Sequence, residues 1–324
     1  MLAAYAASQS ETDPLSGLVV GDRPAPEVQP GWARVRLRTA SLNHHDLWSL
    51  KGVGLPGDRL PMILGCDGAG VDDEGNEVVI HAVVSSPGWS GDETLDPRRS
   101  LLSERYQGTL AEEVVVPRAN LVPKPADLSF VEAACLPTAW LTAYRMLFTQ
   151  SGLKPGDTVL VQGAGGGVAT ALVALGAAAG FRVWVTSRDD AKGERALELG
   201  AHQAFASGAR LPERVDAVME TVGEATWSHS LKALRPGGVV VVCGATSGFN
   251  PPAELNRVYF LQLRVVGSTM GTREELRRLL QMVQTTGVRP VVDSVRPLAE
   301  ARQAVARLTD PDLFGKVVLE VSPT

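Results

Sequence analysis

Hydrophobic and polar positions alternate in a regular way from about residue 130 to residue 268. Short apolar runs, typical of buried strands, are separated by longer stretches in which apolar residues recur at helical spacing. The strands are predicted at 158–162, 182–186, 217–220, 239–243 and 264–267, with helices at about 167–179, 190–199, 224–235 and 253–261. A β-α-β-α-β series with short connections predicts a doubly wound parallel sheet.

Residues that start and stop helices support these predicted elements. Asp189 and Asp190 are suitable N-cap residues for the second helix, and Gly200 suits the position after its end. Pro236-Gly237-Gly238 is expected to end the third helix before the next strand begins.

The first third of the chain has the period-two pattern of β-strands instead. Residues 33–38 alternate apolar and polar side chains, as a half-buried strand does. A Ser-, Pro-, Gly- and Asp-rich stretch over 85–96, with 97–105 after it, predicts a long surface loop. Further short strands are predicted near 68–71, 77–82 and 112–116.

The last fifty residues do not extend the strand–helix alternation. Amphipathic helices are predicted at about 272–286 and 298–309, and short strands at 290–295 and 316–321. We therefore predict one domain formed by residues 1–128 and 269–324, with a nucleotide-binding domain over 129–268 inserted into it.

Composition and charge narrow the function classes. The formal charge is −5, with no basic run, which argues against binding to nucleic acid. Three cysteines far apart in sequence give no disulfide framework and favour a reducing compartment. The first residues lack the basic segment of a signal peptide, so a cytoplasmic location is expected. The uncharged stretch 158–181 has the length of a membrane span, but strand, glycine loop and helix explain it better.

The glycine cluster between the first predicted strand and helix indicates a dinucleotide site. Glycines allow a tight turn and let a pyrophosphate approach the helix N-terminus, whose free N–H groups favour anions. The spacing Gly163, Gly166, Ala169 fits a pattern whose last position need only be small. The residues predicted to hold the cofactor here are Gly163, Gly165, Gly166, Gly167 and Val168.

The end of the second predicted strand indicates which cofactor binds. An NAD enzyme would place Asp or Glu there, about twenty residues after the glycines, to hold the ribose 2′-hydroxyl. This strand ends instead in Thr186, Ser187 and Arg188, and Lys192 follows one turn into the helix. Hydroxyls and a guanidinium suit a 2′-phosphate, so NADPH is the predicted cofactor.

Several motifs along the chain resemble those of the medium-chain dehydrogenase/reductase superfamily, in particular its zinc-lacking, quinone-oxidoreductase-like members. Besides the glycine loop they are Ala40-Ser-Leu-Asn-His-His-Asp46, Pro61-Met-Ile-Leu-Gly-Cys-Asp-Gly-Ala-Gly70, Gly108-Thr-Leu-Ala-Glu-Glu112, Leu141-Thr-Ala-Tyr144 and Gly315-Lys-Val-Val318. The resemblance implies an α/β fold: a Rossmann doubly wound parallel sheet inserted in a GroES-like, mainly β catalytic domain. It also implies a homodimer joined through the last Rossmann strand, here about 263–268.

Zinc-containing members of this superfamily carry two metal sites that the sequence does not reproduce. Three cysteines cannot supply the four thiolates of their structural site. The positions that match their catalytic ligands hold Asn43, Cys66, Asp67 and Thr138. Cys66, Asp67 and one of the adjacent histidines are competent ligand types, but Asn and Thr are poor zinc ligands, so no metal is expected.

Without a metal, another group must stabilise the charge that grows on the substrate oxygen during hydride transfer. The Asn43 amide can donate a hydrogen bond, and the resemblance places His45 where zinc relatives keep a proton-relaying hydroxyl. His45 is therefore the predicted donor or general acid, although packing or helix capping explains it equally well. Asp46 is expected to orient its neighbours, and Cys66 to be a small pocket residue rather than a nucleophile.

The resemblance also carries over cofactor contacts outside the glycine loop. The residues that match such positions are His44, Thr138, Gly244, Ala245 and Lys316, with His44 assigned to the pyrophosphate. Trp48 and Trp89 are candidates for lining the substrate pocket, although a packed tryptophan is the commoner case.

Three functions remain open on the sequence. The first is an NADPH-dependent, zinc-independent reductase of a quinone, enone or other carbonyl compound. Residues 51–56 lack the tyrosine that some quinone reductases carry, which counts against quinones as the natural substrate. The second is an alcohol dehydrogenase acting on a small alcohol or aldehyde, and the third is a non-catalytic, crystallin-like protein that binds NADPH.

Overall fold

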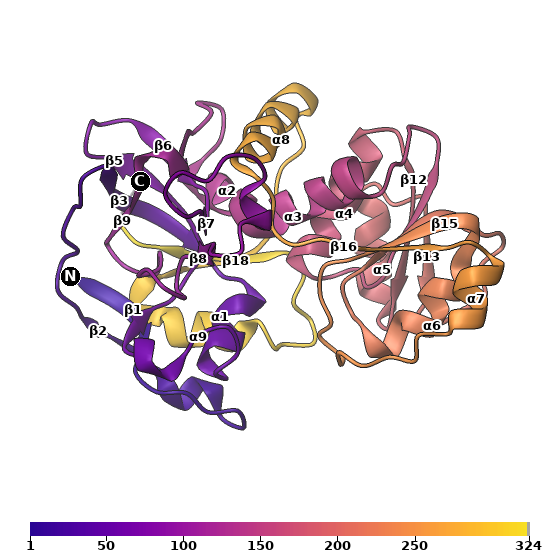
Figure 1. Cartoon of the computed structure of the whole chain (residues 1–324), viewed down its shortest axis with the longest axis horizontal. Helices are drawn as coiled ribbons and strands as arrows, with labels where there is room; N and C mark the ends of the chain where they lie inside the picture. Colours follow the sequence, from indigo (N-terminus) through magenta and orange to yellow (C-terminus); the bar gives the residue numbers. More distant parts are fainter. Residues whose placement is uncertain (323–324) are drawn as a thin grey trace. The chain divides into compact units, whose positions relative to one another are not determined.

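Two compact units make up the chain. The computed structural model describes residues 1–322 (Figure 1). Unit 1 contains Met1–Leu141, Met270–Thr285 and the chain from Val292 onward, and unit 2 contains Thr142–Thr269 and Thr286–Val291. Unit 2 is thus an insertion between segments of unit 1, because the chain leaves unit 1 and later returns to it.

Unit 2 is built on a parallel sheet with the strand order β13-β12-β11-β14-β15-β16. Its strands are β11 (Thr158–Val161), β12 (Arg182–Ser187), β13 (Gln203–Ala206), β14 (Val215–Glu220), β15 (Leu234–Val242) and β16 (Arg264–Gly267). Its helices are α4 (Gly167–Ala178), α5 (Asp190–Glu198), α6 (Glu224–Ala233) and α7 (Leu255–Phe260). In sequence order this sheet is 3-2-1-4-5-6, the order of a Rossmann fold, and the predicted fold class is confirmed.

Two details of unit 2 differ from the prediction. Strand β13 was not expected, because Gln203–Ala206 is a short, half-exposed edge strand with little β-branched character. The Pro236-Gly237-Gly238 stretch does not end α6 but lies inside β15. The pairing of β14 with β15 shifts register between Val215 and Ala217, and Gly237 has φ +76°, so the stretch belongs to an irregular strand start.

The uncharged stretch 158–181 folds as strand β11, a glycine loop and helix α4, as expected. Within residues 1–322, no helix has both the length and the apolar character needed to span a bilayer.

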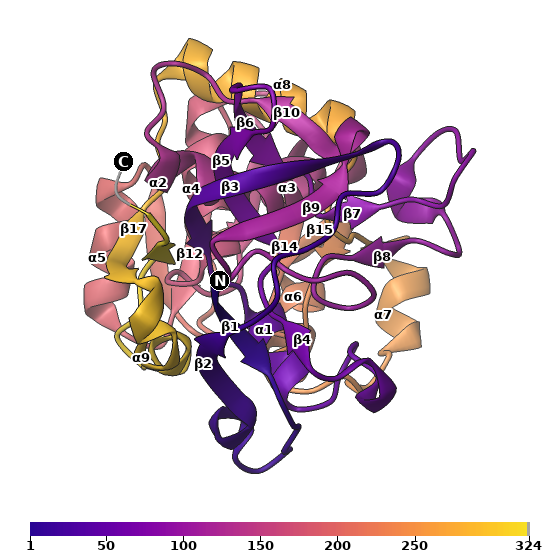
Figure 2. The same ribbon diagram turned by 90° about the vertical axis from the view of Figure 1, so that its left-hand side faces the viewer.

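Unit 1 is mainly β. Its largest sheet has the order β10-β6-β5-β3-β18-β17, with β9 paired to β3 on the same sheet (Figure 2). The strands are β3 (Trp32–Ser41), β5 (Asp67–Asp72), β6 (Glu77–Ile80), β9 (Glu113–Pro117), β10 (Leu121–Pro123), β17 (Val292–Pro297) and β18 (Lys316–Glu320). A second sheet contains β1 (Leu2–Ala6), β2 (Leu18–Asp22) and β4 (Met62–Ile63).

The helices outside unit 2 are α1 (His44–Leu50), α2 (Phe130–Ala134), α3 (Leu141–Tyr144, which straddles the unit boundary), α8 (Arg273–Thr286) and α9 (Ala301–Arg307). Of these, α2 and α9 pack on the strands of unit 1. A core cluster joins Leu47 and Leu50 of α1 to Ala304 and Val305 of α9 and to Leu319 of β18. This packing fixes α1, whose first turn carries two of the predicted catalytic residues, His45 and Asp46.

Several features of unit 1 were missed or simplified in the sequence pattern. The strands β1 and β2 at the start of the chain were not expected. The predicted loop 85–105 contains a short 3₁₀ helix, Glu93–Leu95, and the strand Ser100–Leu101. The predicted helix 298–309 is a 3₁₀ turn, Leu298–Glu300, followed by α9.

The units divide at different residues from those predicted. The predicted break after residue 128 is replaced by one after Leu141, because α2 packs on β3 and β5 of unit 1. The Thr39 hydroxyl fixes this contact by donating to the Phe130 carbonyl at 2.7 Å. The second break, after Thr269, lies one residue from the predicted position, and residues 286–291 are grouped with unit 2.

A buried histidine in unit 1 should make stability depend on pH. His81 is fully buried, its Nε2 donates to the Gly271 carbonyl at 2.8 Å, and burial lowers its pKa. The folded protein therefore resists protonation that the unfolded chain accepts near pH 6.5, so stability is lost as pH falls below about 6.5. Between about pH 7.5 and pH 5.5, the wild type should lose on the order of 1 kcal/mol more unfolding free energy than His81→Gln. Urea titrations at both pH values measure this, and parallel losses in the two proteins would contradict it.

Candidate functional site

Asn43 is the centre of a buried polar cluster in unit 1. Its Nδ2 donates to Asp67 Oδ2 at 2.8 Å, and its Oδ1 accepts from Lys316 Nζ at 2.6 Å. Lys316 Nζ also donates to the Leu42 carbonyl at 2.6 Å and lies 3.5 Å from Asp67 Oδ2. The antiparallel register of β3 with β18, which pairs Ser41 with Val318, brings Lys316 opposite Asn43. Asn43, Lys316 and the Oδ2 atom of Asp67 therefore hold one another in place.

Burial raises the pKa of the Asp67 carboxyl, while the Lys316 ammonium and the Asn43 amide lower it. The Thr138 hydroxyl lies close enough to the Asp67 carboxylate to lower this pKa as well, although the two form no short hydrogen bond. The cluster is thus a buried acid held against a buried ammonium.

Asp46 holds the start of α1 in place, as the sequence predicted for an orienting residue. One carboxylate oxygen accepts from the Asn43 backbone N–H and the other from the Gly65 N–H, both at 2.9 Å. Gly65 has φ +96°, and a Cβ there would lie 2.5 Å from the Thr109 hydroxyl, so only glycine fits. The Asp46 side chain touches only protein, and burial raises its pKa.

His45 stands between an acid and a thiol. Its Nε2 donates to Glu104 Oε1 at 3.0 Å, because a carboxylate can only accept. Its Nδ1 lies 3.4 Å from Cys66 Sγ and 3.5 Å from the Ser103 hydroxyl. Burial alone would lower the pKa of His45, but Cys66, Glu104 and Asp46 together raise it well above the ordinary value.

The two neighbours of His45 Nδ1 are both buried. The Cys66 thiol donates to the Leu102 carbonyl at 3.3 Å, and burial raises its pKa, so it is a neutral thiol near pH 7. The acidic partner of His45 is therefore Glu104. Ser103 has φ +67°, an uncommon conformation for a non-glycine residue, held by the bond from its N–H to the Tyr106 carbonyl.

The donor set at the family's catalytic metal position does not fit zinc. Burial raises the pKa of the Cys66 thiol, Asn43 and Asp67 are bonded to each other, and the Lys316 ammonium repels a second cation. Among residues 1–322, no group of three or more His, Cys, Asp or Glu side chains is arranged to hold a metal ion.

The glycine loop of unit 2 has the geometry that an anion needs. Gly163 has φ +82°, and Gly166 is the N-cap of α4 without any side-chain cap. A Cβ at Gly166 would meet nothing within 4 Å, so the loop is open on that side. Gly165, Gly167 and Val168 complete the turn into the helix, whose N–H groups would face a pyrophosphate.

At the end of β12, some side chains are hydrogen-bonded within the protein and one is not. Thr186 is buried and bonded to Gln162, and Ser187 Oγ donates to the Asp189 carbonyl at 2.7 Å. Asp189 caps α5 by accepting from the Ala191 and Lys192 N–H groups, as predicted. Arg188 is exposed, and its side chain makes no hydrogen bond or ion pair with residues 1–322.

Three further predicted cofactor residues lie at the start of α1 in unit 1 and just after β15 in unit 2. His44 is exposed at the start of α1, and its pKa is lowered by desolvation and by Lys316. Gly244 and Ala245 follow β15 and pack against the loop after β14, where a Cβ on Gly223 would lie 2.8 Å from the Ala245 Cα. Their contacts with a cofactor stay predictions.

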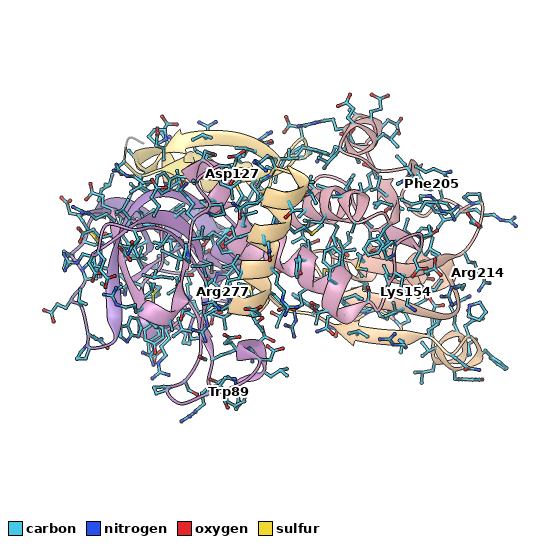
Figure 3. The ribbon with its side chains drawn as sticks, turned by 90° about the horizontal axis from the view of Figure 1, so that it is seen from above. Trp89, Asp127, Lys154, Phe205, Arg214 and Arg277 are labelled. Carbon is cyan, nitrogen blue, oxygen red and sulfur yellow. The ribbon has the colours of Figure 1, made fainter. Side chains whose placement is uncertain are left out.

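Neither predicted tryptophan lies at the polar cluster. Trp89 lies on the loop before Glu93, where its Nε1 donates to the Asp92 carbonyl at 3.0 Å (Figure 3). Trp48, in α1, packs its ring 5.1 Å from the Lys51 ammonium.

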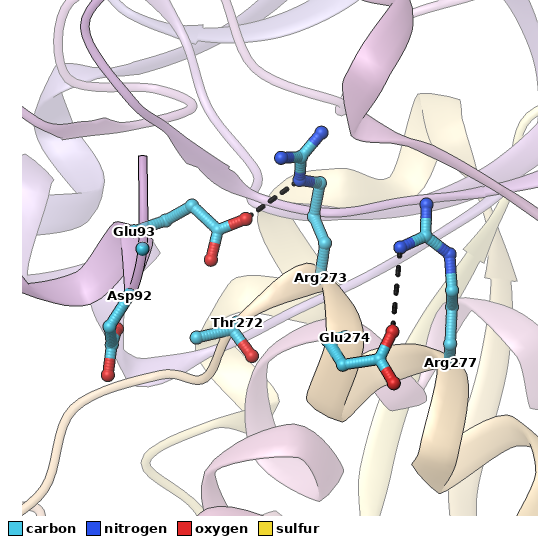
Figure 4. A pocket seen from close by; sticks show the side chains of 7 residues that line it. Asp92, Glu93, Thr272, Arg273, Glu274 and Arg277 are labelled. Atoms are coloured by element: carbon cyan, nitrogen blue, oxygen red, sulfur yellow. Dashed lines mark hydrogen bonds and ion pairs between the residues drawn. The ribbon is translucent and has the colours of Figure 1, made fainter. Parts of the chain in front are cut away.

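A separate pocket of about 310 Å³ lies between this loop and the start of α8 (Figure 4). Its charges are paired internally: Glu93 with Arg273 at 2.8 Å and Glu274 with Arg277 at 3.8 Å. No predicted site residue lines it, and nothing in it points to a ligand.

Several residues of these sites were missed in the sequence. Glu104, Ser103, Gln162, Glu220 and His229 all make buried or half-buried polar contacts beside predicted residues. The spacing of residues in the sequence does not predict these contacts, because each residue meets its partner from another part of the chain.

Comparisons with known proteins agree over nearly the whole chain. The model for the alcohol dehydrogenase GroES-like domain matches residues 29–126, and that for zinc-binding dehydrogenase matches residues 167–285. A zinc-type alcohol dehydrogenase-like protein of Schizosaccharomyces pombe is 31% identical, covering 91% of this chain and 92% of its own. Crotonyl-CoA reductase of Streptomyces avermitilis is 28% identical, covering 98% and 85%.

A solved structure of an NAD-dependent alcohol dehydrogenase superposes with a TM-score of 0.91 and 36% identity, covering 99% of this chain and all of the other. Fold, motifs and relatives therefore agree with the resemblance found in the sequence. The chain belongs to the medium-chain dehydrogenase/reductase family and is an oxidoreductase with a GroES-like domain and a Rossmann-type domain.

Proposed function

We propose that the protein uses NADPH to reduce a carbonyl compound, or a carbon–carbon double bond conjugated to a carbonyl, without a metal ion. The observation that carries the proposal is the engagement of Asn43, Asp67 and Lys316 with one another at the position of the family's metal. A reductase with such a site must stabilise the substrate oxygen through protein donors.

The nicotinamide supplies a hydride to the electrophilic carbon, and the substrate must also gain a proton. The Asn43 amide keeps one N–H beyond the bond to Asp67 and can donate it to the oxygen that becomes negative. The raised pKa of His45 favours the protonated imidazole, whose Nδ1 lies 3.5 Å from the Ser103 hydroxyl. We assign His45 as the proton source, acting directly or through the Ser103 hydroxyl.

Arg188 supports NADPH over NADH. The end of β12 carries no acid to hold a ribose 2′-hydroxyl, since the Asp189 carboxylate caps α5. Arg188 is exposed there and offers a planar fork of donors to a 2′-phosphate. Lys192, in the first turn of α5, adds a positive charge.

Conjugated thioesters and enones are the favoured substrate class. Among the relatives are reductases named for such compounds, crotonyl-CoA reductase and, at 26% identity, acryloyl-coenzyme A reductase. Quinones are less favoured, because residues 51–56 lack the tyrosine of some quinone reductases.

NADPH oxidation followed by absorbance tests this proposal, with an enone, an unsaturated acyl thioester, a quinone and an aldehyde, each with and without chelator. Turnover of a conjugated substrate that survives the chelator is the expected result. Chelator-sensitive turnover would overturn the metal-free assignment. NADPH binding without any turnover would favour the non-catalytic alternative.

Alcohol oxidation is the second candidate, because the superposed structure at 36% identity is an NAD-dependent alcohol dehydrogenase. This candidate predicts that NAD⁺ or NADP⁺ is reduced when short alcohols are supplied, at rates above those of the reductive reaction.

We also propose that the protein is a homodimer joined through β16. This strand is the last of the parallel sheet, and Val265 on it is 50% exposed. The helix before it exposes Leu255, Tyr259 and Phe260, an apolar surface that a second copy would cover.

The predicted cytoplasmic location stays a prediction.

Val265→Asp should convert the dimer to a monomer, because it places a charge at the centre of the proposed strand pairing. Light scattering coupled to size-exclusion chromatography measures the mass of each form. Val28→Asp, at another exposed valine in unit 1, is the matched control and should remain dimeric. A monomeric wild type would refute the proposal.

A further inference from the structure

A glutamine directly before the glycine loop is fully buried, and its side chain joins three elements of unit 2. Gln162 follows β11, and its Oε1 accepts from the Thr186 hydroxyl at the end of β12 at 2.7 Å. Its Nε2 donates to His229 Nδ1 and to the Ser230 hydroxyl of α6, both at 2.9 Å. Each polar atom of the amide therefore has a protein partner.

Thr186 connects this amide to the loop itself. Its hydroxyl oxygen accepts from the Gly163 N–H at 3.3 Å while the hydroxyl hydrogen goes to Gln162. Gly163 is the first glycine of the loop and has φ +82°. The N–H at this turn is thus held by the Thr186 side chain of the neighbouring strand.

At the α6 end of this series of hydrogen bonds, groups that can only accept fix the direction of each bond. Ser230 donates to Glu220 Oε2 at 2.6 Å, so its oxygen must accept from Gln162. The Glu220 carboxylate also accepts the N–H groups of Val222 and Gly223. His229 Nε2 donates to the Ala209 carbonyl at 2.9 Å, which leaves Nδ1 as an acceptor. Every donor in the series is directed the same way, from Gly163 toward Glu220.

We propose that Gln162 and Thr186 are positioning residues that hold the glycine loop in its dinucleotide-binding conformation. The inference rests on the proposed function and deepens it. A loop with four glycines loses much conformational entropy when it is ordered, and a Cβ at Gly166 would meet no atom within 4 Å. The Gly163 N–H bond and its buried continuation hold the start of this loop from the neighbouring strand, and such pre-ordering strengthens binding.

This assignment gives Thr186 a different role from a ligand of the 2′-phosphate. Its hydroxyl hydrogen is committed to Gln162, and the residue is buried, whereas Arg188 on the same strand end is exposed. Loss of a positioning group weakens binding of both dinucleotides equally, since the pyrophosphate is common to NADPH and NADH. Loss of a 2′-phosphate ligand would weaken binding of NADPH alone.

A double-mutant cycle on dinucleotide affinity tests the proposal. Thr186→Val and Gln162→Met remove the hydrogen bonds with little change of volume, and calorimetry gives the Kd values for NADPH and NADH. Each single variant should raise both Kd values by about fivefold to tenfold, the size expected for a buried hydrogen bond. The double variant should be no weaker than about twice the worse single variant, because both substitutions break the same series. Thr158→Val, on the opposite end of β11, is the matched control and should leave both Kd values unchanged.

Amide hydrogen exchange gives a readout that needs no ligand. Exchange of the segment 163–167 should be faster in Thr186→Val and Gln162→Met than in the wild type or the control variant. Unchanged exchange, additive losses, or a loss confined to NADPH would each overturn the positioning role. A wild type that binds NADH in preference to NADPH would refute the proposed cofactor and leave this test intact, because the cycle is read with either dinucleotide. A wild type that binds neither would refute both.

Discussion

Replacing His45 by alanine is expected to lower kcat by about a hundredfold to ten-thousandfold, the range found when a general acid is removed. The expectation rests on the place of the imidazole, with Glu104 at 3.0 Å on one nitrogen and Cys66 and Ser103 on the other. The KM of the dinucleotide should change little, because the glycine loop belongs to unit 2. Steady-state kinetics with a conjugated carbonyl substrate measures both constants.

The pH dependence of the same reaction separates His45 from its neighbours. Because the pKa of His45 is raised, the protonated, donating form is lost only as pH rises through that raised pKa. The rate should therefore fall on the alkaline side, and Glu104→Gln should move this fall to lower pH by removing the charge that favours the imidazolium. Glu113→Gln, which breaks only the pairing with Arg34, is the matched control. An alkaline limb that is the same in Glu104→Gln and wild type would show that His45 is not the titrating acid.

The Rossmann half of the fold could be predicted because its signals are local. Strand β11, the glycine loop and α4 are consecutive, and each shows its own local pattern: an apolar run, a glycine cluster and an Ala-rich helical stretch. Strand β13 was not predicted because Gln203–Ala206 is short and lies at the sheet edge. The strands β1 and β2 were not predicted because small residues and glycine weaken their alternation, and β1 is held by pairing with β2 and β4.

The candidate site could be predicted only as far as its motifs reach. Asn43, Asp46 and Cys66 were found through the resemblance, and Asp46 does orient its neighbours. Glu104 could not be found, because its contact with His45 joins residues 59 positions apart in the chain. Ser103 has a positive φ, and a serine at this position does not predict that backbone conformation.

Two predicted cofactor residues, Lys316 and Thr186, show a limit of inference from matching positions. The resemblance named Lys316, and the structure surrounds its ammonium with Leu42, Asn43 and Asp67. The sequence placed Thr186 at the adenosine ribose, and the structure bonds it to Gln162 and Gly163. For both residues, the sequence predicted the position along the strand but not the hydrogen-bond partners. The partners could not be predicted because they come from other elements of the fold.

Replacing Arg188 by alanine should raise the Kd for NADPH by about tenfold to a hundredfold and that for NADH by less than about threefold. The reason is the loss of a charge-assisted, two-pronged hydrogen bond to the 2′-phosphate, which contributes about 1.5–3 kcal/mol. Arg188 is exposed and makes no hydrogen bond or ion pair within residues 1–322, so its removal leaves no buried partner unsatisfied. Calorimetric titration of both dinucleotides, combined with a thermal unfolding curve, measures affinity and stability separately.

Arg182→Ala is the matched control, because Arg182 lies at the opposite end of the same strand and pairs with Glu213 on the surface. This variant should bind both dinucleotides as the wild type does. If Arg188→Ala weakened NADPH and NADH equally, the guanidinium would be acting on the shared pyrophosphate or through the loop, not on the 2′-phosphate. If neither affinity changed, recognition of the ribose would depend on Ser187 and Lys192 or would favour NADH, as in the NAD-dependent alcohol dehydrogenase that superposes on this chain. The selectivity ratio, rather than either affinity alone, therefore decides whether the basic end of β12 determines the cofactor.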